Sequence, residues 1–256
     1  MKRIRVIPIL LLQAGGLVKT VGFKKPNYIG DPINAVKIFN EKEVDELAFI
    51  DIEASIKNTE PDYLKIEEIA SECFMPLAYG GGIKNIEQVK KIINIGVEKI
   101  IVNSAIISNP EIITQTAQIY GSQSVVASVD VKKNLFGKYV CYTHSGKTKI
   151  KQKLTAYLKQ IEQLGAGEII LTSIDKEGTF SGYDIELIRK AAETVSVPVV
   201  ANGGASCIED FTKAVQAGAS AIAAGSFFVY KSKNKGVLIN YPAQKELKEK
   251  LFEKIV

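Results

Sequence analysis

Two stretches of this 256-residue chain share one layout: residues 76–104, PLAYGGGIKNIEQVKKIINIGVEKIIVNS, and residues 198–226, PVVANGGASCIEDFTKAVQAGASAIAAGS. In each, an apolar run ends in Gly-Gly, a stretch with helical periodicity follows, and a second apolar run ends in a serine. The two stretches begin 122 residues apart, and the same shift places Glu46 on Glu168. The layout predicts two related halves, about residues 1–120 and 121–256.

Short apolar runs alternate with helix-like stretches along the whole chain, and each run is typical of a buried strand. They cover residues 5–11, 46–52, 76–81, 99–104, 125–130, 168–174, 198–204 and 221–226. Eight β/α units in a chain of this length favour a closed parallel barrel over an open sheet. We therefore predict one domain, residues 1–256, folded as a (β/α)8 TIM barrel made of two (β/α)4 halves.

Composition limits the classes of function. The net charge of +5 is modest and lysines occur in many segments, so no nucleic-acid partner is expected. Cys73, Cys141 and Cys207 have no metal-ligand spacing, which predicts reduced thiols of a cytoplasmic protein and no metal site. The apolar run near the N-terminus contains Pro8 and is too short for a signal peptide or a membrane span, so no membrane partner is expected either.

Both repeated stretches carry residues suited to binding phosphate. Glycines after a strand let backbone N–H groups approach an anion closely, and the start of a following helix adds further donors. Ser104 and Ser226, at the ends of the next apolar runs, offer hydroxyl groups. Glycine pairs can also be simple tight turns, but the pairing of the motifs favours two anion sites on opposite rims. Such a site predicts a small molecule with a phosphate at each end.

Four segments make a more specific match: DELAFIDIEAS at 45–55, YGGGI at 79–83, GAGEIILTSIDKEGTFSGYD at 165–184 and VPVVANGGA at 197–205. Together they resemble the cyclase subunit of imidazole glycerol phosphate synthase, a lyase of histidine biosynthesis, over about residues 3–230. The resemblance implies a glutaminase subunit docked under the barrel. It also implies that ammonia travels along the barrel axis to a bis-phosphorylated ribonucleotide, with no cofactor.

The resemblance assigns roles to single residues. Lys19 matches the lysine of the family's mobile first loop, and Asp130 matches one of its two catalytic aspartates. The other aspartate falls on Leu11, and Ala14 stands where an acidic residue is usual. The implied phosphate-binding residues are Gly82, Asn103 and Ser104 in the first half, and Gly178, Gly204, Gly225 and Ser226 in the second.

Alternation along the strands predicts what lies inside the barrel. Side chains two residues apart share a face, which puts Arg5, Glu46, Lys99 and Glu168 together at the bottom. From the residues alone, a salt-bridged plug and a functional ring are equally open, and the resemblance implies an ammonia gate. Above this ring, inward isoleucines would line an apolar passage that suits neutral ammonia: Ile7, Ile9, Ile50, Ile101 and Ile170.

Leu11 separates the chain from the family's chemistry, because leucine cannot transfer a proton and Gln13 cannot act as a base. Either Asp130 alone suffices, or Asp51 or Asp175 has taken over, or cyclisation is inefficient. His144, the only histidine, is expected to be a polar loop residue rather than a catalyst. The roles of Tyr142 and Lys147 stay open.

The C-terminal part departs from the ordinary subunit. KSKNKGVLINYP at 231–242 and AQKELKEKLFEKIV at 243–256 are similar to the variant found beside sugar amidotransferases of surface-polysaccharide pathways. That variant implies delivery of ammonia to a third enzyme that makes an acetamidino sugar, although the segment also fits a plain final helix on the barrel. Two alternatives remain: a genuine histidine-pathway cyclase, and a scaffold that activates a glutaminase without conducting ammonia.

Overall fold

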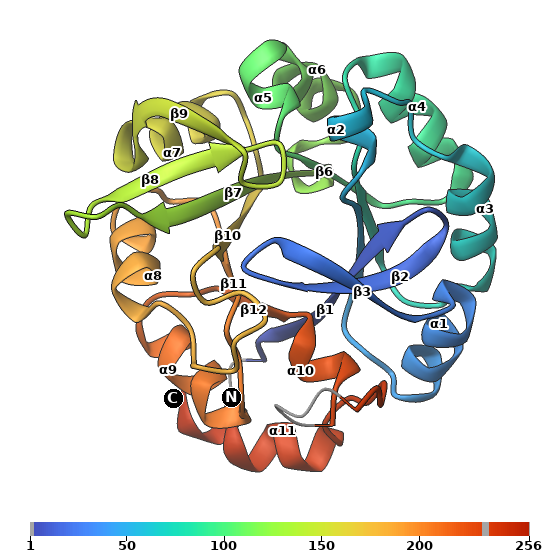
Figure 1. Cartoon of the computed structure of the whole chain (residues 1–256), viewed down its shortest axis with the longest axis vertical. Coiled ribbons are helices and arrows are strands. Elements are labelled where there is room, and N and C mark those ends of the chain that lie inside the picture. The colour runs from blue at the N-terminus through green and yellow to red at the C-terminus, as the bar shows by residue number, and fades with distance from the viewer. Residues whose placement is uncertain (1–2, 232–235, 256) are drawn as a thin grey trace.

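The barrel predicted from the sequence is present in the computed structural model, which describes residues 3–231 and 236–255. Eight parallel strands form its wall: β1 (Arg5–Gln13), β4 (Leu47–Asp51), β5 (Leu77–Gly80), β6 (Lys99–Val102), β7 (Val125–Lys133), β10 (Glu168–Ser173), β11 (Val199–Asn202) and β12 (Ala221–Ala224). Each pairs with its neighbour in this order, and pairing of β12 with β1 closes the ring (Figure 1). The (β/α)8 fold class is therefore confirmed.

Helices surround the strands because each buries one apolar stripe against them. The longer ones are α1 (Pro32–Glu41), α3 (Tyr63–Glu72), α4 (Ile86–Ile95), α6 (Glu111–Tyr120), α7 (Leu154–Gln163), α8 (Ile185–Ala192), α9 (Ile208–Gln216) and α11 (Gln244–Lys250). Short turns of helix follow three strands at the upper rim: α2 (Ala54–Lys57), α5 (Ala105–Ser108) and α10 (Ser226–Val229). The remaining two are 3₁₀ turns, η1 (Ser122–Ser124) and η2 (Phe252–Lys254).

Two antiparallel hairpins were missed by the sequence analysis. One is formed by β2 (Gly16–Val21) and β3 (Lys24–Gly30), and the other by β8 (Tyr139–Thr143) and β9 (Thr148–Lys153), which extend β7. Two of their strands, β3 (KKPNYIG) and β9 (TKIKQK), lack the apolar runs that mark the barrel strands. The β2–β3 hairpin lies across the middle of the ring in Figure 1, where it covers the mouth of the barrel.

The apolar interior is divided in two by the barrel wall. Outward strand side chains pack against the helices in a large core, while a separate cluster fills the barrel itself. This inner cluster consists of Ile7, Ile9, Ala48, Ala78, Ile101, Val126, Ile170, Val200, Ala221 and Ala223, with Leu11 and Ile50 at its edge. All five isoleucines predicted to face inward belong to it or border it.

The C-terminal segment folds back onto the barrel. Part of the stretch compared with the polysaccharide variant, residues 232–235, lies outside the described residues. Beyond it, the hydroxyl of Tyr241 donates a hydrogen bond to the Val6 carbonyl at 3.0 Å, and its ring stacks on Phe228. Leu247 of α11 is fully buried, so this helix packs on the barrel as the plainer alternative predicted. Among the described residues, no helix combines the length and apolar character needed to cross a membrane.

Candidate active site at the barrel mouth

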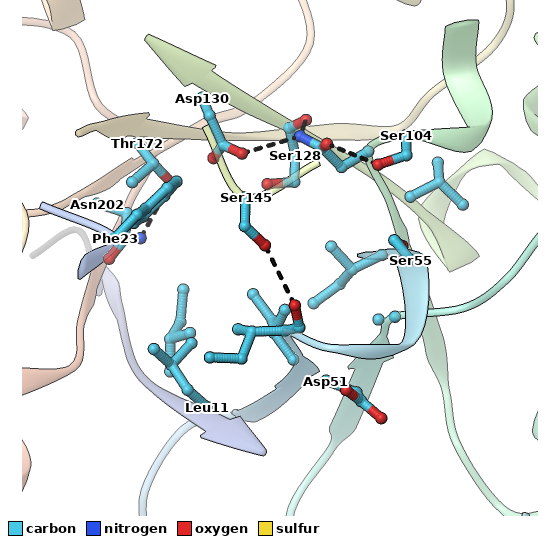
Figure 2. Close-up of a pocket in the computed structure, with 18 of the residues that line it drawn as sticks. Leu11, Phe23, Asp51, Ser55, Ser104, Ser128, Asp130, Ser145, Thr172 and Asn202 are labelled. Atoms are coloured by element: carbon cyan, nitrogen blue, oxygen red, sulfur yellow. Dashed lines mark hydrogen bonds between the residues drawn. The ribbon is translucent and has the colours of Figure 1, made fainter. Parts of the chain in front are cut away.

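A cavity of about 130 Å³ lies at the carboxyl ends of the strands, and residues of the β2–β3 hairpin form part of its lining. TIM barrels keep their active sites at this face. The cavity wall combines the end of the inner apolar cluster with polar side chains from several strands, including Ser128, Thr172 and Asn202 (Figure 2). Ser128, Thr172 and Asn202 were not proposed as site residues from the sequence, although Thr172 and Asn202 stand at the ends of β10 and β11.

Asp130 is the buried carboxyl of this cavity. It is only 7% exposed, and its Oδ2 accepts a hydrogen bond from Asn103 Nδ2 at 3.1 Å. Burial raises the pKa of Asp130 from its ordinary value to about 7, against the opposing effect of hydrogen bonds from Asn103 and Thr172. The Asn103 amide is itself held by the Ser128 carbonyl at 2.9 Å. A carboxyl with a pKa near neutrality can both donate and accept a proton at physiological pH.

Leu11 lies on the opposite side of the cavity from Asp130 in Figure 2. It pairs with Ile50 across β1 and β4 and continues the inner apolar cluster to the cavity wall. Gln13 donates instead to Glu53 at 2.9 Å, outside the residues that line the cavity. The side of the cavity opposite Asp130 is therefore formed at this position by a hydrocarbon side chain. The family resemblance implies a catalytic aspartate there.

The two carboxylates considered as replacements differ in position. Asp51 lines the cavity, but its Oδ1 accepts hydrogen bonds from Glu53 N at 2.8 Å and Ala54 N at 3.0 Å. Asp175 is exposed, binds the Lys133 amide at 2.9 Å and lies outside the cavity lining. Of the two, only Asp51 is placed where it could contact a bound molecule, and it is engaged with the start of α2.

Lys19 reaches the site from β2. Its side chain is 4% exposed and forms an ion pair with Glu177, a residue of the loop after β10. Thr20 also donates to Glu177 at 3.2 Å, and the Gly22 amide donates to its carbonyl at 2.9 Å. Glu177 thus fastens the hairpin to the rim. Glu177 was not predicted as a site residue from the sequence, although it stands beside Gly178 in the DKEGT segment.

The residues proposed for the first phosphate site line the same cavity as Asp130. The backbone of Gly82 has a φ of +71°, and an added Cβ would lie 2.9 Å from the Ala54 Cβ. The Ser104 hydroxyl accepts from Thr143 at 2.9 Å and from the His144 amide at 3.3 Å. Gly82, Asn103 and Ser104 are therefore brought together by β5, β6 and the β8–β9 hairpin.

The residues proposed for the second phosphate site line a smaller hollow: Gly178, Gly204, Gly225 and Ser226. An added Cβ on Gly204 would lie 2.3 Å from the Gly182 carbonyl oxygen, and its φ of +109° favours glycine. At Gly225 an added Cβ would lie 2.8 Å from Lys19 Cε, so the lysine chain passes over the bare backbone. The Lys19 ammonium consequently stands at the border between the hollow and the upper cavity.

Four charges close the opposite end of the barrel, where the strands begin. Arg5 Nη1 lies 2.5 Å from Glu46 Oε2, and Arg5 Nη2 is also paired with Glu168. Lys99 Nζ completes the ring, 2.7 Å from Glu46 and 3.1 Å from Glu168. Both glutamates are buried, while the Arg5 side chain is 35% exposed. The pairing with both glutamates raises the pKa of Arg5 against the effect of its burial.

The other residues singled out from the sequence lie at the edge of the site or away from it. His144 stands in the turn between β8 and β9 with a φ of +53°, and its buried Nδ1 has no hydrogen-bond partner within the described residues. Tyr142 lies on β8, and Lys147 is exposed in the same hairpin. Over residues 3–231 and 236–255, His, Cys, Asp and Glu side chains form no group of three that could hold a metal.

The protein is a (β/α)8 barrel with a cavity at the carboxyl ends of its strands, and both polar and apolar side chains line this cavity. A family described as "Histidine biosynthesis protein" matches residues 5–234. A Vibrio vulnificus protein provisionally named imidazole glycerol phosphate synthase subunit hisF3 is 53% identical over 98% of this chain and 97% of its own length. A Thermobifida fusca protein named imidazole glycerol phosphate synthase subunit HisF, without a provisional label, is 39% identical over 88% of this chain and 90% of its own length.

A Pseudomonas aeruginosa protein provisionally named subunit hisF2 of the same synthase is 49% identical over 94% of this chain and 97% of its own length. The chain belongs to the HisF-like family of imidazole glycerol phosphate synthase cyclase subunits. The family resemblance inferred from its motifs is thus confirmed.

Proposed function

We propose that this chain conducts ammonia from a cytoplasmic glutaminase subunit, bound at the four-charge ring, to an acceptor at the barrel mouth. The observation that carries the proposal is the apolar cluster that connects the ring to the upper cavity. Neutral ammonia loses little when it leaves water for such surroundings, whereas ammonium would be desolvated without a counter-charge. The ring would admit ammonia when one of its ion pairs rearranges.

The chain is proposed to be a poor cyclase. Proton transfer by a placed side chain contributes about 10²–10⁴-fold to a rate. The pKa of Asp130, about 7, suits it to transfer one proton of the cyclisation. The Leu11 side chain cannot transfer the other. Loss of this partner in an otherwise retained site favours a barrel that delivers ammonia over one that cyclises a ribonucleotide.

The acceptor is proposed to be bound by a sugar amidotransferase that forms an acetamidino sugar for lipopolysaccharide or O-antigen. The similarity of residues 231–256 to the polysaccharide-associated variant supports this. The relatives' names agree with a specialised copy, because those at 49% and 53% identity carry the numbers 2 and 3. The glycine cradles would then hold phosphate groups of the acceptor, as Gly82 with Ser104 and Gly204 with Ser226.

A direct assay tests the cyclase part. The purified chain is given the family's bis-phosphorylated ribonucleotide and ammonium, and product formation is compared with that of Leu11→Asp. We expect very slow turnover by the unaltered chain, and we expect Leu11→Asp to raise it by about 10²-fold or more. Leu11→Asn, which has similar size and no ionisable group, is the matched control and should stay slow. Brisk cyclisation by the unaltered chain would contradict the proposal.

A second assay separates a conduit from a scaffold. The chain is combined with its glutaminase subunit, and the ammonia released into solution is compared with the glutamine consumed. Lys99→Met should block or leak ammonia while glutaminase activation persists; a scaffold would show unchanged coupling. Lys37→Met is the control, because Lys37 makes an exposed ion pair with Glu72 on the outer helices.

A genuine histidine-pathway cyclase is the second candidate. The pKa of about 7 at Asp130 and the retained Lys19 favour it, since both groups would serve cyclisation. The first assay decides between the two, because only this candidate predicts rapid turnover with leucine at position 11.

A further inference from the structure

One region of the chain, which includes the β8–β9 hairpin, accounts for the net positive charge. Residues 131–161 contain eight lysines and no aspartate or glutamate. The chain has 33 cationic and 28 acidic side chains, so without this region its net charge would be −3 instead of +5. The region includes the end of β7 and the whole of β8 and β9, and Figure 1 shows the turn between β7 and β8 reaching past the ring of helices.

Most of these lysines have no acidic partner. Lys133 pairs with Glu186 at 3.0 Å on the outer side of the hairpin. Across the described ranges, no carboxylate lies within ion-pair distance of six others in β7, β8, β9 and their turns: Lys132, Lys138, Lys147, Lys149, Lys151 and Lys153. All six are exposed. An accumulation of unpaired exposed charge of one sign is a field that attracts an anionic surface.

The tip of the β7–β8 hairpin presents two apolar side chains to solvent. Leu135 is 102% exposed and Phe136 is 86% exposed. The turn that carries them is ordered by Asn134, whose Oδ1 accepts from the Phe136 and Lys138 amides, both at 2.9 Å. The Gly137 amide closes the turn on the Asn134 carbonyl at 2.9 Å. The two apolar groups are therefore held outward by a fixed turn and touch no core.

We propose that this hairpin docks the protein on a bilayer surface that contains anionic lipid. Leu135 and Phe136 enter the boundary between headgroups and acyl chains, and the unpaired lysines bind the anionic headgroups. Neighbouring apolar and basic groups are the combination that holds peripheral proteins at such surfaces. No membrane partner was expected from the sequence, because only spanning segments and total charge were considered there. The structure places Lys132 and Lys138 beside the turn that carries Leu135 and Phe136, and Lys151 and Lys153 along the adjacent β9.

The apolar tip is what favours a lipid surface over a nucleic acid. A nucleic acid would use the lysines equally, but it offers no apolar phase for a fully exposed leucine. The hairpin also rises from the carboxyl ends of the strands, so docking leaves the ring of Arg5, Glu46, Lys99 and Glu168 accessible at the other end. The inference stands independently of the proposed function.

Co-sedimentation with vesicles tests the proposal. The purified chain is mixed with vesicles of phosphatidylcholine alone or of phosphatidylcholine with phosphatidylglycerol. We expect binding only to the anionic vesicles, weakened by salt. Lys149→Gln/Lys151→Gln/Lys153→Gln should weaken it about a hundredfold, at about fivefold per lysine. Leu135→Ser/Phe136→Ser should weaken it at least about tenfold through lost apolar burial.

Two control variants make the result specific. Phe74→Ser removes an equally exposed apolar side chain at 85% exposure before β5, and Lys245→Gln/Lys248→Gln removes charge from α11. Both should bind like the unaltered chain, and circular dichroism checks that every variant is folded. The proposal is overturned if anionic vesicles do not bind, if neutral vesicles bind equally, or if the hairpin variants bind undiminished. Binding of a labelled DNA duplex that depends on the lysines but not on the tip, and is tighter than vesicle binding, would also overturn it.

Discussion

Replacing Asp130 by asparagine should change how stability depends on pH. Burial raises the pKa of this carboxyl from 3.8 to about 7 in the folded protein. Below about pH 4 the group is protonated in both the folded and the unfolded state, so it carries no penalty. Between about pH 4 and pH 7 the unfolded chain is ionised, while the folded chain keeps its proton because ionisation would bury a charge. The free energy of unfolding therefore falls over this range.

The size of the effect follows from the shift. About three pH units correspond to about 4 kcal/mol lost between pH 4 and pH 8. Asparagine occupies nearly the same volume and has no proton to lose, so Asp130→Asn should gain about that much stability relative to the unaltered chain as the pH rises. Urea unfolding of both proteins at a series of pH values measures the difference directly.

The control is Ser128→Ala, which alters a neighbouring buried residue without removing a titrating group. Its unfolding free energy should run parallel to that of the unaltered chain. Equal pH dependence in Asp130→Asn and the unaltered chain would refute the assignment of a buried, neutral carboxyl at the cavity. It would also remove the argument that Asp130 is suited to proton transfer near neutrality.

Three further substitutions test other parts of the structure. Lys99→Met should lower the free energy of unfolding by about 2–4 kcal/mol, because two buried glutamates would be left with one cation. Adding Glu46→Gln should recover part of that loss, and urea unfolding of the single and double variants decides. Gly204→Ala should lose about 1–3 kcal/mol and any binding of inorganic phosphate measured by calorimetry, since its φ of +109° and a carbonyl at 2.3 Å exclude a Cβ. Gly236→Ala is its control, because an added Cβ there meets no heavy atom within 4 Å among residues 3–231 and 236–255, and it should change neither quantity. Tyr241→Phe should cost about 1 kcal/mol in thermal unfolding through its lost hydrogen bond to β1; an unchanged melting temperature would mean that this bond does not hold the C-terminal segment.

The strands of the barrel wall and the side chains inside it could be predicted because two patterns recur along the sequence. Each strand is a short apolar run, and alternation within it decides which side chains face inward. Counting two residues at a time from Leu11 leads down β1 to Arg5, and the same count on β6 and β10 leads to Lys99 and Glu168. The four charges meet in the structure because parallel strands bring their first residues to one end.

The two hairpins beside the cavity, β2–β3 and β8–β9, could not be predicted in the same way. One strand of each hairpin, β3 and β9, is mostly polar, and the hairpins form because their backbones pair with each other and with neighbouring strands. The Lys19–Glu177 pair joins residues 158 apart in the chain, so no local pattern indicates it. The pKa of Asp130 depends on its burial in the folded protein, which an isolated strand sequence does not reveal.

Leu11 acquires a physical meaning from its neighbours. In the structure it extends the inner apolar cluster up to the cavity that contains Asp130. A second carboxylate there would bring like charge into the same cavity and raise the pKa of Asp130 further. Leucine instead keeps this side of the cavity apolar and adds no ionisable group opposite Asp130. For the proposed conduit this is an advantage, because ammonia that arrives neutral meets less acid on its way out of the barrel.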